Sequence, residues 1–208
     1  MITSDLDEFL ERAAARLRPA PETTPSLAHG DHYIDRQSLP RMPDLPMRPA
    51  AVLVPIVTHG DEATVLLTER ATGLRTHSGQ IAFPGGRIDP GETPLDTALR
   101  EGEEEIGLDP GAVRPLGYLD GYHSSTGYVV TPVVGLVTPP LALTLNPHEV
   151  TEAFEVPLGF LMDPANHEVH ARDWKGGIRQ YYAMPWRERY IWGVTAAILR
   201  NLYVRLHE

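Results

Sequence analysis

Four glutamates occupy five consecutive positions, at residues 101 and 103–105, shortly after a turn rich in glycine. Thr93 followed by Pro94 predicts the start of a helix, because a threonine hydroxyl can cap the first amides and proline suits the first helical position. Gly107 can end that helix in the left-handed conformation. Carboxylates this close repel one another unless a cation lies among them. The segment therefore predicts a helix that binds metal ions.

A rotation of 100° per residue places Glu101, Glu104 and Glu105 on one face of this helix. Glu103 points elsewhere and is expected in solvent. An apolar stripe on another face can be buried, and it consists of Leu95, Ala98, Leu99 and Ile106. Gly102 lies amid that stripe and costs about 1 kcal/mol relative to alanine. We therefore expect the helix to approach a sheet closely there.

Arg100 lies four residues before Glu104, within reach of an ion pair that would orient this carboxylate. Hard oxygen ligands favour Mg²⁺, Mn²⁺ or Ca²⁺ over zinc or copper. Because Mg²⁺ usually takes one or two carboxylates and completes its shell with water and substrate phosphate, the pattern suits phosphoryl hydrolysis. The alternative is a solvated helix face, as in most charge runs. Glycines at positions 85, 86 and 91 favour the metal site, since their spacing fits a specific loop.

The remaining sequence predicts a layered α/β domain with a mixed β-sheet. Apolar periodicity indicates a short helix over residues 4–18 and a closing helix over residues 191–206. Runs at 51–57 and 63–68 predict a β-hairpin, in which Pro55 implies an edge strand or a bulge. Further strands are predicted at residues 81–83, 113–119, 128–137, 169–172 and 178–184.

Residues 1–49 are expected to form an N-terminal helix and a proline-rich extended segment, and residues 50–208 the main domain. The N-terminal segment could be a lid, a dimer arm or packing, which leaves a homodimer open. A net charge of −10 argues against nucleic-acid and anionic-membrane partners. No stretch approaches the roughly 20 apolar residues that span a bilayer. The absence of cysteine excludes disulfides, and we expect a soluble, cytoplasmic protein.

The sequence resembles the Nudix hydrolase signature at Gly86, Glu92, Arg100 and residues 101–108. Gly102 departs from that signature, which prefers a bulky aliphatic residue. Residues 66–86 resemble the longer and narrower signature of the coenzyme A pyrophosphatase branch of the family. The resemblance extends from about residue 51 to residue 199.

The resemblance implies a Nudix-type α/β/α sandwich that hydrolyses the pyrophosphate bond of coenzyme A or acyl-CoA with Mg²⁺ or Mn²⁺. The products would be 3′,5′-ADP and 4′-phosphopantetheine or its acyl form. By resemblance, Glu101 and Glu105 would be metal ligands, and Glu104 a further ligand or the group that orients the attacking water. Glu92 and Arg100 would support the loop and the helix. An additional acid from a later loop would be Glu149 or Glu152.

The branch signature also implies substrate-binding residues. Arg70 and Arg75 could meet phosphates bidentately. His77 and Gln80 could contact the substrate or orient the loop, or they could form hydrogen bonds within it. The implied substrate site is completed by Gly85 and Gly86.

Two other functions stay open from the sequence alone. The chain could be a Nudix enzyme that hydrolyses another nucleoside diphosphate derivative, such as ADP-ribose. It could also be a module that senses a nucleotide without catalysis.

For Trp174, Trp186 and Trp192, packing is favoured over stacking on adenine.

Overall fold

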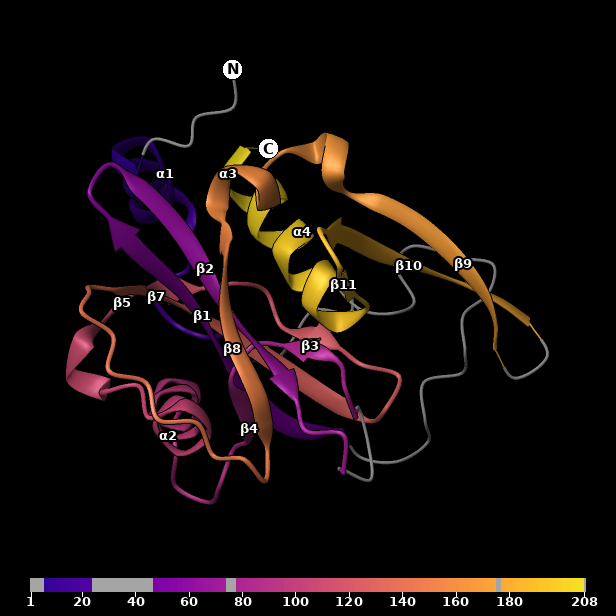
Figure 1. Ribbon diagram of the computed structural model, residues 1–208, viewed down its shortest axis with the longest axis horizontal. Coiled ribbons are helices and arrows are strands. Elements are labelled where there is room, and N and C mark those ends of the chain that lie inside the picture. Colours follow the sequence, from indigo (N-terminus) through magenta and orange to yellow (C-terminus); the bar gives the residue numbers. More distant parts are fainter. Residues whose placement is uncertain (1–5, 24–46, 74–77, 175–176, 208) are drawn as a thin grey trace.

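The computed structural model describes residues 6–23, 47–73, 78–174 and 177–207 (Figure 1). Its centre is a mixed β-sheet. The strands of this sheet are β1 (Arg48–His59), β2 (Glu62–Arg70), β3 (Ile81–Ala82), β4 (Gly85–Arg87), β5 (Val113–Tyr118), β6 (Tyr122–His123), β7 (Tyr128–Val137) and β8 (Val150–Pro157). The main path runs β3-β2-β1-β7-β5, while β4 pairs with β1, β6 with β7 and β8 with β2. The β1–β7 pair is parallel and the other pairs are antiparallel, which confirms the predicted mixed sheet.

A second, antiparallel sheet has the order β11-β10-β9 and lies to one side of the first (Figure 1). Its strands are β9 (Glu168–Trp174), β10 (Gly177–Trp186) and β11 (Arg189–Trp192). Strands β9 and β10 correspond to two predicted strands, whereas residues 191 and 192 of β11 fall within the predicted closing helix. That helix, α4, begins at Val194.

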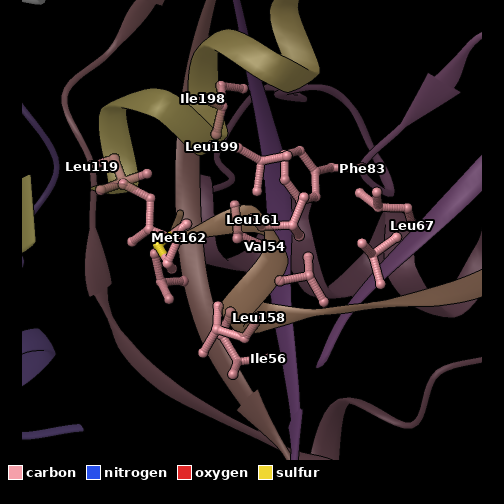
Figure 2. Close-up of a cluster of buried hydrophobic side chains, with 14 of the residues drawn as sticks. Val54, Ile56, Leu67, Phe83, Leu119, Leu158, Leu161, Met162, Ile198 and Leu199 are labelled. Carbon is pink, nitrogen blue, oxygen red and sulfur yellow. The ribbon is translucent and has the colours of Figure 1, made fainter. Parts of the chain in front are cut away.

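Helices cover both faces of the central sheet, which confirms the expected α/β/α sandwich. One face carries α2 (Pro94–Ile106), whose Ala98 and Ile106 pack with Leu53 of β1. The other face carries α3 (Leu158–Leu161) and α4 (Val194–His207). Figure 2 shows the core on that second face, where labelled side chains of β1, β2, α3 and α4 meet.

The N-terminal helix α1 (Leu6–Arg16) packs against α4, at the other end of the chain. Its buried Phe9 and Ala13 belong to the same apolar core as the central strands. The Nε of Arg205 donates to the carbonyl of Arg16 at 2.9 Å, across 189 residues of sequence. The proline-rich segment that follows lies mostly outside the described residues, at positions 24–46.

The β1–β2 hairpin is confirmed, with His59 opposite Glu62 and a left-handed Gly60 in the turn. The prediction that Pro55 marks an edge or a bulge is wrong, because β1 is central. Its parallel partner β7 runs beside it without interruption, with Gly135 opposite Pro55. On the other side, β2 pairs with residues 56–59 and β4 with residues 50–52. Proline is tolerated because its missing N–H falls between these two ladders.

The predicted ends of α2 are confirmed. Thr93 is the N-cap and forms a capping box with Asp96, while Pro94 opens the helix. Gly107 ends it with φ 68° and donates its N–H to the carbonyl of Glu103. These caps fix the rotation of the helix, and therefore the direction of its glutamates. None of the helices in the described ranges is long and apolar enough to cross a membrane.

Gly102 is buried against β1, but the close approach does not require glycine. A Cβ at this position would meet Leu53 Cδ2 at 3.5 Å and Leu108 Cδ2 at 3.9 Å, which are ordinary van der Waals contacts. We expect Gly102→Ala to stabilise the protein by about 0.5–1 kcal/mol, since alanine is the better helix former. Urea unfolding of both proteins measures this difference, and a lower unfolding midpoint for the variant would contradict it.

Candidate active site

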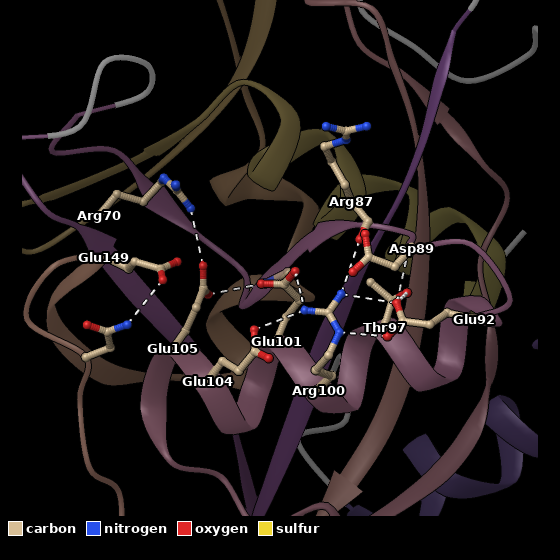
Figure 3. Close-up of polar contacts among 12 residues, drawn as sticks. Arg70, Arg87, Asp89, Glu92, Thr97, Arg100, Glu101, Glu104, Glu105 and Glu149 are labelled. Carbon is tan, nitrogen blue, oxygen red and sulfur yellow. Dashed lines mark hydrogen bonds and ion pairs between the residues drawn. The ribbon is translucent and has the colours of Figure 1, made fainter.

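Three elements meet at the glutamates of α2 (Figure 3). The helix presents the acids, β4 brings the backbone of Gly85 and Gly86 beside them, and Arg70 reaches them from the end of β2. This arrangement joins α2 to the segment at residues 66–86.

Glu105 is the buried acid of the site, with only 1% of its surface exposed. The N–H of Gly85 donates to its Oε2 at 3.3 Å, and Arg70 Nη1 lies 3.5 Å from its Oε1. Burial raises the pKa of Glu105 to about 7; the Arg70 charge opposes this shift, whereas the Glu101 charge adds to it. A second cation close by would stabilise the ionised form of a carboxyl group in these surroundings.

Glu101 lies against β4, where the absence of a side chain at Gly86 makes room for it. A Cβ on Gly86 would come within 2.2 Å of Glu101 Oε1. Burial raises the pKa of Glu101, while hydrogen bonding to Arg100 lowers it and the charge of Glu104 raises it further. Glycine at position 86 is therefore part of the carboxylate site itself.

Arg100 binds three of the surrounding acids. Its Nε and Nη2 hold Glu92 at 2.7 and 3.1 Å, and its Nη1 contacts Glu101 at 2.9 Å and Glu104 at 3.0 Å. The predicted Arg100–Glu104 ion pair is thus confirmed. Hydrogen bonds from Arg100 and Thr97 lower the pKa of Glu92 to about 2. Glu104 is the most exposed of the three glutamates on this face of α2, with 55% of its side chain exposed.

The two candidates for an additional acid lie in different surroundings. Glu149 lies beside the α2 glutamates, close enough for its charge to raise the pKa of both Glu101 and Glu105 (Figure 3). Asn146 holds it there: its Nδ2 donates to Glu149 Oε1 at 3.1 Å, and its backbone N–H donates to the carbonyl of Glu105. Glu152 instead forms a 2.6 Å ion pair with Arg189.

The predicted substrate residues are only partly described. Arg70 lies at the carboxylates, and its Nε is buried without a hydrogen-bond partner within the described part of the chain. The carbonyl of Gln80 accepts from the N–H of Arg70 at 3.0 Å, which ties β3 to this position. Arg75 and His77 lie outside the described residues.

Two of the three tryptophans have side chains within the described residues, and both show packing contacts. Trp186 packs against the main core, and Trp192 lies edge-on to Tyr181 with a centroid distance of 5.4 Å. The side chain of Trp174 is outside the described set.

The carboxylates fit a hard divalent cation. Their donor atoms are all oxygen, and the charge of Glu101 adds to the raised pKa of Glu105 in spite of the opposing charge of Arg70. Across the described ranges, no three acidic or histidine residues are already gathered around one point. Mg²⁺ needs only one or two carboxylates, since water and phosphate oxygens complete its shell.

Comparison with known proteins decides the family. The NUDIX domain model matches residues 47–175. A relative from Yersinia pestis, named "Uncharacterized Nudix hydrolase NudL", is 41% identical over 202 residues, which cover 95% of this chain and 92% of the relative. The chain belongs to the Nudix family. It is a Nudix pyrophosphohydrolase, and enzymes of this family act on small molecules and generally use divalent metal ions.

The fold is also similar to that of solved structures. A Deinococcus radiodurans protein superposes with a TM-score of 0.50 at 16% identity, over 79% of this chain and 90% of that one. A Nudix hydrolase from M. smegmatis, RenU, is 27% identical over 55% of this chain and 73% of its own, with a TM-score of 0.47.

The buried Glu105 carboxyl makes the stability of the metal-free Nudix domain depend on pH. Because its folded pKa of about 7 exceeds the ordinary 4.5, the folded state holds more protons than the unfolded state between these values. Stability should therefore fall as pH rises from about 4.5 to about 7, by at most about 3 kcal/mol.

Glu105→Gln should remove this dependence and be the more stable protein at pH 8. Urea unfolding with a chelator at pH 5 and pH 8 measures both quantities. A wild-type protein that gained stability over this window through Glu105 would contradict the sign of the effect.

Proposed function

We propose that this Nudix hydrolase cleaves the pyrophosphate bond of coenzyme A or acyl-CoA, with Mg²⁺ or Mn²⁺, to 3′,5′-ADP and 4′-phosphopantetheine or its acyl form. The observation that carries the proposal is the contact between the segment at residues 66–86 and helix α2. That segment resembles the coenzyme A branch, and its Arg70 lies 3.5 Å from Glu105. The buried, unpartnered Nε of Arg70 among the described residues favours an anionic ligand such as a phosphate.

In this proposal Glu101 and Glu105 hold the metal, with Glu104 as a further ligand or as the group that orients water. A bound divalent cation supplies charge neutralisation on the phosphate oxygens and acidifies water. Arg70 binds a phosphate oxygen through its guanidinium, and Arg100 keeps Glu101 and Glu104 pointing to the same side. The backbone of Gly85 and Gly86 lets the substrate approach closely.

We assign the additional acid to Glu149 in preference to Glu152. Glu149 interacts electrostatically with both Glu101 and Glu105, whereas Glu152 is engaged by Arg189. Asn146 occupies Glu149 Oε1, so Oε2 is the atom that accepts a proton from the attacking water. As the water oxygen bonds to phosphorus, the bridging P–O bond breaks and the leaving phosphate takes its electrons.

The test is turnover of coenzyme A and ADP-ribose under the same Mg²⁺ or Mn²⁺ conditions, with products separated by chromatography. Formation of 3′,5′-ADP from coenzyme A at the higher kcat/KM is expected. Faster turnover of ADP-ribose would overturn the coenzyme A assignment. Tight calorimetric binding of a nucleotide with no product would overturn catalysis and favour the sensing module.

A further inference from the structure

A cross-strand pair of like charges lies just outside the site. In the β2–β8 ladder, Glu69 stands directly opposite Glu152. Carboxylates in this relation repel one another and weaken a strand pair. The sheet keeps them together here, next to Arg70, so a compensating group is required.

Arg189 of β11 supplies that compensation. Its Nη2 lies 2.6 Å from Glu152 Oε1 and its Nη1 lies 3.8 Å from Glu69 Oε2. Its guanidinium also stacks over Phe154, 3.6 Å from the ring centroid. A single side chain of the second sheet therefore bridges both acids of the pair.

The Glu69–Glu152 pair lies next to a β-bulge that sets the orientation of residues in the candidate active site. Directly after Glu69 the register shifts, so that Arg70 faces Val150 and Thr151 is the extra residue. The hydroxyl of Thr151 donates to the carbonyl of Glu69 at 3.2 Å. Because a one-residue shift moves side chains to the other face, the bulge sets the orientation of the residues beyond it.

The residues beyond the bulge include Arg70 and Glu149, which lie beside the glutamates of α2. The N–H of Ala71 donates to the carbonyl of Glu149 at 2.8 Å, which closes the ladder after the shift. Arg70 of β2 contacts Glu105, and Glu149, which directly precedes β8, acts on the same carboxylate through its charge. Loss of the shifted register would move both groups away from α2.

We infer that Arg189 is a positioning residue for the reaction: by neutralising Glu69 and Glu152 it holds the bulge that aims Arg70 and Glu149 at the glutamate helix. The inference rests on the proposed function for the roles of Arg70 and Glu149. Arg189 belongs to the second sheet and lies outside both α2 and residues 66–86.

The experiment compares wild type, Arg189→Met, Arg189→Lys and the triple variant Glu69→Gln/Glu152→Gln/Arg189→Met. Arg189→Met should lower kcat by about tenfold or more, as loss of a supporting partner does at metal sites. Arg189→Lys keeps the charge and should retain most of the kcat. The triple variant should regain most of it, because the repulsion that Arg189 compensates is then absent.

A second readout needs no substrate. Amide hydrogen exchange at Ala71 reports the hydrogen bond to Glu149; it should accelerate severalfold in Arg189→Met and return toward wild type in the triple variant. Wild-type kcat and exchange in Arg189→Met would overturn the inference, as would a triple variant no better than Arg189→Met in both. If the wild type prefers another nucleotide over coenzyme A, the same comparison on that nucleotide still tests Arg189.

Discussion

Replacement of Glu101 by glutamine is expected to lower kcat by on the order of a thousandfold or more while the protein stays folded. The amide keeps the size of the side chain and fits the space left by Gly86, but it removes the charge that would hold the cation. The pKa of Glu101 is raised by burial, so loss of the charge should not destabilise the metal-free fold. Steady-state turnover with saturating Mg²⁺ and thermal unfolding measure the two effects.

Glu103→Gln is the matched control, because this residue lies on the same helix and is exposed. It makes the same chemical change two positions away and should leave kcat within about twofold, as expected for a surface site. A Glu101→Gln protein with near-wild-type turnover would remove Glu101 from the centre of the mechanism. Equal losses in both variants would point to the overall charge of the helix.

Gly86→Ala is expected to give a folded protein whose kcat falls by about a hundredfold, since misplacement by about 1 Å can cost that much. The added Cβ would lie 2.2 Å from Glu101 Oε1 and 2.5 Å from its Cδ. These atoms are the end of a flexible side chain, so they can move at little cost to stability. The displaced carboxylate is then no longer beside Glu105.

Gly85→Ala provides the contrast. Its Cβ would lie 2.5 Å from the carbonyl oxygen of Ala51 and 2.7 Å from Val52 Cα, both in the backbone of β1. A central strand cannot yield in this way, so this variant should unfold at a clearly lower temperature. The prediction fails if Gly86→Ala is the less stable of the two, or if it retains wild-type turnover.

Local signals account for the parts of the fold that the sequence could predict. The ends of α2 follow from Thr93, Pro94 and Gly107, which act on their own neighbours, and the hairpin follows from a short turn between two apolar runs. The rotation of α2 follows from helical periodicity. Each of these features depends on residues close together in the chain.

The parts of the fold that the sequence could not predict depend on pairing between residues far apart in the chain. Strand β8 was not predicted, because its half-exposed polar positions hide the apolar alternation of a strand. The prediction for Pro55 is wrong because β1 can hold a proline where its pairing changes from β4 to β2, and this position depends on distant residues. The choice of Glu149 over Glu152 depends on Asn146 and Arg189, which come from other elements. The signal for Arg189 was absent from the sequence, since Glu69 and Glu152 become neighbours only through the ladder.

The packing of α1 on α4 makes one core depend on two helices that lie far apart in the sequence. Phe9 and Ala13 of α1 are buried in the same apolar core as the side chains of α4. Bringing distant segments together costs loop-closure entropy before their contacts can form. We therefore expect α1 to dock on α4 only after the strands of the central sheet have paired.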